Sequence, residues 1–135
     1  MFVDASAMVA MLTDESDGPE LAERLAEAAV RHTSPVAIFE TVAGIARKRS
    51  YSLDEARAIV ARFLELADVR IMVIGAAECD AALLAFDRFG KGRHPASLNM
   101  GDCFAYACAT TLGQPLLFKG NDFTRTDIVA APTPH

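Results

Sequence analysis

The sequence predicts an α/β domain built on a mainly parallel sheet. The chain has 135 residues, of which 52% are hydrophobic, enough to bury a core of useful size. Short apolar segments alternate with longer segments of helical spacing, and this alternation favours parallel strands joined by helices on both faces of the sheet. No repeat, linker or low-complexity segment interrupts the pattern, so we expect a single domain over residues 1–135.

The strands are predicted from short apolar or β-branched segments. Phe2 and Val3 start the chain and end at Asp4, and residues 69–74 are bounded by Asp68 and Gly75. The turn before Val36 leads either into a very short strand or directly into a helix. About five short strands are expected in all, at residues 2–3, near 36, 69–74, 116–118 and 128–129.

The helices are predicted where apolar residues recur at helical spacing. Ser6 is expected to cap the first helix, and Ser52 opens a segment of capping-box form that ends in Glu55. Pro19 lies near the start of the second helix. The expected helices cover residues 7–12, 20–30, 38–49, 53–67, 76–89 and 100–112.

The last of these helices begins in a polar turn and continues as a nearly apolar one. Asn99 is the expected N-cap, which places Asp102 in the first turn. There Asp102 can serve simply as a capping acid that complements the helix dipole. It can also present a carboxylate to a functional site, and the helix alone does not decide between the two.

The composition limits the class of protein. A formal net charge of −5 argues against a protein that coats nucleic acid, although a nuclease with its acids gathered in one pocket is compatible with it. The three cysteines sit in apolar patterns without CxxC spacing, which favours buried free thiols in a reducing cytoplasm. Neither a basic signal-peptide start nor a membrane-length apolar run is present, so a cytoplasmic protein without membrane contact is expected.

Four carboxylates are predicted to meet at one edge of the sheet. Asp4 follows the first strand and Asp122 follows the 116–118 strand, so both belong at the carboxyl edge, where α/β proteins bind ligands. Asp102 starts the helix that leads into that last strand. Glu40 is expected in the first turn of the helix after Val36. Each acid alone also has an ordinary explanation as a turn or first-turn residue.

Such a cluster favours a bound divalent cation. Two charges about 5 Å apart repel by roughly 3 kcal/mol at an effective dielectric constant of about 20. All-oxygen ligands suit Mg²⁺ or Mn²⁺, and the lack of histidine in the set argues against zinc. His32 and His94 are interpreted as ordinary surface residues. Three further acids share one polar loop and are interpreted as solvated: Asp14, Glu15 and Asp17.

The order and spacing of four motifs resemble a PIN-domain ribonuclease, specifically a VapC-type toxin of type II (VapBC) toxin–antitoxin pairs. The motifs are FVDASA at residues 2–7, SPVAIFE at 34–40, LNMGDCFAYA at 98–107 and LLFKGNDF at 116–123. The resemblance covers essentially the whole chain and implies a PIN-like α/β/α sandwich. Asp4, Glu40, Asp102 and Asp122 match the family's acids, with Asn121 or Asp127 as alternatives for the fourth.

The resemblance implies an endoribonuclease that uses Mg²⁺ or Mn²⁺ to activate water and leaves 5′-phosphate products. Asp4 and Asp102 would be the main metal ligands, Glu40 and Asp122 would bind through water or hold a second ion, and Ser6 would orient Asp4. It also implies a homodimer, a small VapB-like antitoxin and a tRNA, rRNA or mRNA substrate. The basic residues that could steer RNA are Arg47, Lys48, Arg49, Arg88, Lys91, Arg93, Lys119 and Arg125.

Other classes fit less well. A haloacid-dehalogenase-type phosphatase needs an acid two residues after its first Asp, where this chain has Ser6. A receiver domain needs an acidic pair after the first strand, which is not apparent. The remaining alternative is a catalytically inert PIN-like module that binds RNA or protein, against which the set of Asp4, Glu40 and Asp102 weighs.

Overall fold

Four parallel strands form the sheet of the computed structural model, which describes residues 1–133. Their order is β3-β2-β1-β4, so β1 lies inside the sheet between β2 and β4. The strands are short: β1 (Phe2–Val3), β2 (Arg31–Thr33), β3 (Val69–Ile71) and β4 (Leu116–Leu117). Phe2, Val3, Leu116 and Leu117 are fully buried and form the centre of the core.

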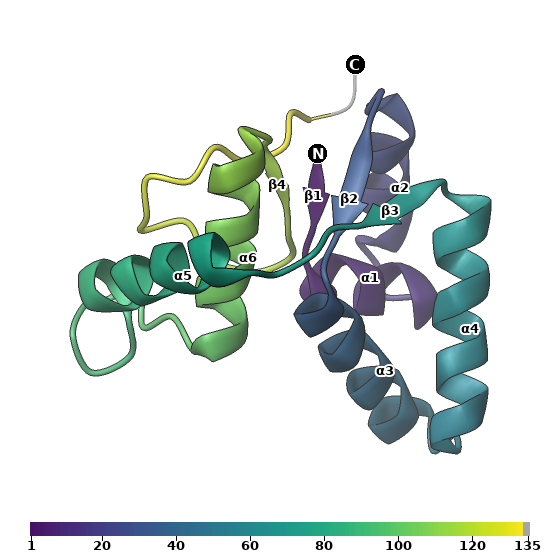
Figure 1. The fold of residues 1–135 in the computed structure, drawn as a ribbon. Helices are drawn as coiled ribbons and strands as arrows, with labels where there is room; N and C mark the ends of the chain where they lie inside the picture. Colours follow the sequence, from purple (N-terminus) through teal and green to yellow (C-terminus); the bar gives the residue numbers. More distant parts are fainter. Residues whose placement is uncertain (134–135) are drawn as a thin grey trace.

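Six helices connect and cover these strands (Figure 1). The chain passes from β1 through α1 and α2 to β2, and from β2 through α3 and α4 to β3. It then returns through α5 and α6 to β4, with α6 packed on both β1 and β4. The helices are α1 (Ala5–Leu12), α2 (Gly18–Glu27), α3 (Pro35–Arg49), α4 (Leu53–Leu66), α5 (Ala76–Phe89) and α6 (Met100–Leu112).

The predicted α/β class, the parallel sheet and all six helices are confirmed, and of the two alternatives at Val36 the direct entry into a helix is the observed one. One strand was not predicted, and one predicted strand is wrong. Residues 31–33 form β2, although Arg31 and His32 lack the apolar character that marked the other strands. Residues 128–129 form no strand, and only an isolated bridge joins Ala130 to Leu116. The sheet therefore has four strands instead of about five.

Helix starts differ from the predictions where the chain supplies an earlier cap. Asp4, not Ser6, is the N-cap of α1, because its carboxylate accepts the Ser6 backbone N–H at 3.1 Å. Ser34 caps α3 through the Ala37 N–H, and Pro35 occupies the first turn. Helix α3 thus begins earlier than expected, and Glu40 lies in its second turn rather than its first.

The exposure of two side chains also differs from the prediction. Cys79 is exposed on α5, whereas Cys103 and Cys108 are buried free thiols as expected. His32 is half-buried and lies 3.0 Å from the side-chain oxygen of Gln114, so it is not a plain surface residue. Among residues 1–133, no helix has both the length and the apolar character needed to cross a membrane.

Candidate metal centre

Asp4 lies at the carboxyl end of the inner strand β1 and is 5% exposed. Its backbone N–H donates to the Leu117 carbonyl at 2.9 Å, which fixes it beside the end of β4. Its Oδ2 accepts the Ser6 hydroxyl at 2.5 Å and the Ser6 backbone N–H at 3.1 Å. Burial raises the pKa of Asp4, the bonds from Ser6 oppose this rise, and the charge of Asp122 adds to it.

Asp102 is held at the start of α6 by a reciprocal capping box, as predicted. Asn99 accepts the Asp102 backbone N–H at 2.8 Å, and Asp102 Oδ2 accepts the Asn99 backbone N–H at 3.1 Å. Burial raises the pKa of Asp102 to about 6, with smaller upward contributions from the charges of Asp122 and Asp4. The bond from the Asn99 N–H works in the opposite direction.

Glu40 reaches the same place from α3, which contacts α6. Its carboxylate lies against Gly101, where a Cβ atom on residue 101 would collide with it. Burial raises the pKa of Glu40 to about 7, and the charges of Asp4 and Asp102 add to the rise. Gly101 is a site residue that the sequence prediction missed, since nothing local shows that a side chain from α3 needs this space.

Asp122 follows β4 in an exposed loop, and its charge acts on both Asp4 and Asp102. Asp127, an alternative fourth acid, is bound elsewhere: it accepts the Tyr106 hydroxyl and pairs with Arg88 at 3.1 Å. The bond from Tyr106 lowers the pKa of Asp127. Asn121 is exposed, and its backbone carbonyl closes a turn with Thr124. The geometry therefore favours Asp122 over both alternatives.

The structure thus brings all four predicted acids into one electrostatic neighbourhood. Within residues 1–133, none of the four forms an ion pair with Lys, Arg or His. Their donor set is carboxylate oxygen, which suits Mg²⁺ or Mn²⁺. In the described part of the chain, however, no three acidic, His or Cys side chains are already arranged around a single ion position. The residues fit a hard cation by the chemistry of their donor atoms.

Cys103 follows Asp102 directly but does not suit the role of a nucleophile. Burial raises the pKa of its thiol to about 11, and the charge of Asp102 adds to this rise. The thiol therefore stays protonated at neutral pH, and the nucleophilic form of cysteine is the thiolate. The chemistry that the site can support lies in its carboxylates.

Most of the basic residues considered for RNA steering are paired with acids. Lys48 and Lys119 contact Glu15, Arg49 lies near Asp14, Arg88 pairs with Asp127, and Arg93 pairs with Asp87. The interpretation of Glu15 as a solvated loop residue is therefore wrong. In the described part of the chain, the candidates that form no ion pair are Arg47, Lys91 and Arg125.

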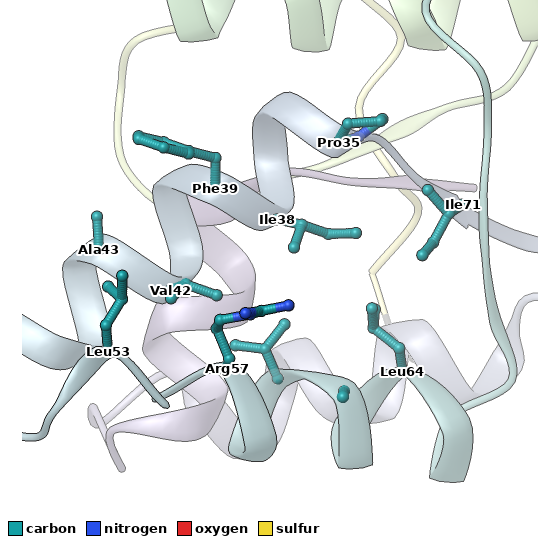
Figure 2. A pocket seen from close by; sticks show the side chains of 11 residues that line it. Pro35, Ile38, Phe39, Val42, Ala43, Leu53, Arg57, Leu64 and Ile71 are labelled. Atoms are coloured by element: carbon teal, nitrogen blue, oxygen red, sulfur yellow. The ribbon is translucent and has the colours of Figure 1, made fainter. Parts of the chain in front are cut away.

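An apolar groove of about 600 Å³ lies between α3 and α4 (Figure 2). The side chains that line this groove come from both helices, and Arg57 reaches between them (Figure 2). Those from α3 are Ile38, Phe39 and Val42, and those from α4 are Leu53 and Leu64. Phe39 is 75% exposed although it directly precedes Glu40. An exposed apolar surface of this kind is typical of a protein-binding site.

Comparison with known proteins agrees with this arrangement. The PIN domain family model matches residues 1–129, so the chain belongs to the PIN-domain family. Several of the relatives that it matches are named VapC ribonucleases. The protein named ribonuclease VapC from Mycolicibacterium smegmatis is 44% identical over 130 residues, covering 96% of this chain and 98% of the relative. Ribonuclease VapC30 from Mycobacterium tuberculosis is 43% identical over 145 residues, covering 99% of this chain and 100% of the relative.

A solved structure shares the fold. The crystal structure of Mycobacterium tuberculosis VapC20, described as a sarcin-ricin loop cleaving toxin, matches with a TM-score of 0.76. The match covers 98% of each chain at 21% sequence identity. This likeness confirms the PIN-like α/β fold, and the predicted resemblance to VapC proteins is confirmed by the closer sequence relatives.

Proposed function

We propose that this protein is an endoribonuclease that depends on Mg²⁺ or Mn²⁺ and acts as the toxin of a toxin–antitoxin pair. The observation that carries the proposal is the convergence of Asp4, Glu40, Asp102 and Asp122 without a cationic side chain to pair with them. The ribonuclease names of its relatives support the reaction type.

The chain's own residues would divide the work of holding the ion. Asp4 and Asp102 are the main ligands in this proposal, because hydrogen bonds from Ser6 and Asn99 already orient them. Glu40 and Asp122 are more exposed and would act through water or at a second ion. When bound, the ion lowers the pKa of a bound water and offsets the charge that grows on the phosphate oxygens.

The substrate would be guided by charge and by contacts to unstacked bases. Arg47, Lys91 and Arg125 are the basic candidates that remain unpaired with acids within residues 1–133. We expect tRNA, rRNA or mRNA as the substrate class and 5′-phosphate ends on the products. The formal net charge of −5 fits a nuclease that binds RNA locally rather than coating it.

A VapB-like antitoxin and a second copy of the chain are the proposed partners. The groove between α3 and α4 offers apolar surface next to Glu40, so an antitoxin segment bound there would also lie near the acids. A homodimer is expected on the basis of family membership.

RNA cleavage by the purified, antitoxin-free protein tests the proposal. Total tRNA and rRNA would be incubated with Mg²⁺ or Mn²⁺, with and without EDTA, beside the Asp102→Asn variant. The proposal predicts cleavage that EDTA abolishes and that the variant loses. Cleavage that survives EDTA, or that is undiminished in Asp102→Asn, would contradict the mechanism, and a wild-type protein that cuts no RNA would favour the inert module.

A further inference from the structure

Glu15 and Lys119 form an ion pair that joins two loops beside the acidic cluster. Glu15 lies in the turn between α1 and α2, and Lys119 directly follows the 116–118 segment. The Lys119 ammonium also lies 3.3 Å from Asp17, and the Lys48 ammonium lies 3.2 Å from Glu15. These contacts lower the pKa of Glu15, chiefly through the bond from Lys119, so its carboxylate is charged at neutral pH.

The backbone of Lys119 reaches the cluster directly. Its N–H donates to the Ser6 hydroxyl oxygen at 3.0 Å, and that hydroxyl lies 2.5 Å from Asp4 Oδ2. A serine hydroxyl has only one proton to donate. Because the Lys119 N–H occupies the oxygen as a donor, the Ser6 proton is directed to the Asp4 carboxylate.

The loop that starts at Lys119 also carries Asp122. Gly120 has φ +94°, a left-handed conformation that glycine adopts without steric cost and that turns the chain at this point. After Asp122 the chain is fixed again at Phe123, which is buried and packs on Phe118 at 5.1 Å between ring centroids. The Lys119 side chain is therefore the anchor on the near side of the loop, and Phe123 is the anchor on the far side.

We infer that Glu15 is a positioning residue of the metal centre. Through Lys119 it holds both the hydrogen bond that orients Asp4 and the loop that presents Asp122. Glu15 acts through another residue and need not touch ion or RNA. The inference rests on the proposed function, because it assigns Glu15 to the site at which the acids would bind the ion.

Four variants test this arrangement: Glu15→Gln, Lys119→Met, their double variant and Lys119→Arg. For each, Mn²⁺ affinity is measured by calorimetry without RNA, and kcat and KM are measured on RNA. Each uncharged single variant should weaken Mn²⁺ binding and lower kcat about fivefold with KM nearly unchanged, and the double variant should be no worse than either single one. Lys119→Arg keeps the charge, so its Mn²⁺ affinity and kcat should stay at the wild-type values. As a matched control, Asp87→Asn breaks the exposed ion pair with Arg93. This variant should change neither the Mn²⁺ affinity nor kcat.

Three other outcomes would overturn the inference. If Lys119→Met raises KM without lowering kcat and Glu15→Gln has no effect, Lys119 contacts RNA and the inference is wrong. Variants that lose thermal stability but keep wild-type Mn²⁺ affinity and kcat would also overturn it, since the pair would then be only structural. A wild-type protein that neither binds Mn²⁺ nor cleaves RNA would overturn the proposed function and the inference together.

Discussion

The carboxylate of Glu40 lies against Gly101, in the space that a Cβ atom on residue 101 would occupy. This contact joins the second turn of α3 to the first turn of α6, directly beside Asp102. The absence of a side chain at one position thus allows an acid from a distant segment to join the cluster.

Gly101→Ala is expected to displace Glu40 while leaving the fold intact. The colliding atoms are at the end of a flexible side chain, so the backbone need not move. Alanine also favours a helix over glycine by about 1 kcal/mol, so the melting temperature should hold or rise. RNA cleavage should nevertheless fall about tenfold or more. In a Glu40→Ala background the same substitution should have no further effect on cleavage, and an equal loss in both backgrounds would contradict this account.

The metal-free protein should lose stability as the pH rises from about 5 to 8. The folded pKa values of Asp102, about 6, and Glu40, about 7, lie above their ordinary values, so the folded state binds more protons across this window. The stabilisation that these bound protons provide is therefore complete below the pKa values that the two groups have in the unfolded chain. It is lost as the pH rises through their pKa values in the folded protein. With a discount for the partial exposure of both groups, the free energy of unfolding falls by something on the order of 2 kcal/mol across this pH range.

Denaturant unfolding at a series of pH values measures this dependence. Glu40→Gln and Asp102→Asn should each flatten the curve, and added Mn²⁺ should stabilise the wild type most at the upper end of the pH range. A wild-type protein that is more stable at pH 8 than at pH 5 without metal would show that the acids are not held at raised pKa values.

Ser6→Ala should raise the pKa of Asp4 further, because both the Ser6 hydroxyl and its backbone N–H lower it and the variant removes the hydroxyl. The acidic limb of the pH profile of kcat should then move to higher pH, and Mn²⁺ binding should weaken by about tenfold. Ser6→Thr keeps the hydroxyl and should behave as the wild type. An unchanged pH profile in Ser6→Ala would show that the bond does not tune Asp4.

Asp122→Asn and Asp127→Asn separate the two candidates for the fourth acid. Asp122 acts electrostatically on Asp4 and Asp102, whereas Asp127 is bound to Tyr106 and Arg88. We expect Asp122→Asn to weaken Mn²⁺ binding several-fold and Asp127→Asn to leave it unchanged. The reverse order would assign the fourth position to Asp127.

Local signals in the sequence predicted the parts of the molecule that depend on neighbouring residues. The capping box of Asn99 and Asp102 follows from their spacing, and the position of Asp4 follows from the end of an apolar strand. The strand at residues 31–33 was missed because it is identified by pairing with β1 and β3 rather than by apolar side chains.

The contacts between distant segments could not be predicted in this way. The packing of Glu40 on Gly101 depends on how α3 and α6 cross, and the pair of Glu15 with Lys119 joins residues 104 positions apart. A loop acid such as Glu15 looks solvated until the fold brings a lysine to it. The roles of the site residues themselves stay predictions that the variants above would test.

Calorimetric titration of Mn²⁺ into the wild type, Asp4→Asn and Asp102→Asn shows whether these acids form a metal centre, and it needs neither the RNA target nor the antitoxin. Circular dichroism would verify that each variant is folded. We expect saturable binding to the wild type, weakened about tenfold or more in each variant. Equal, weak binding by all three proteins would contradict a metal centre built from these acids.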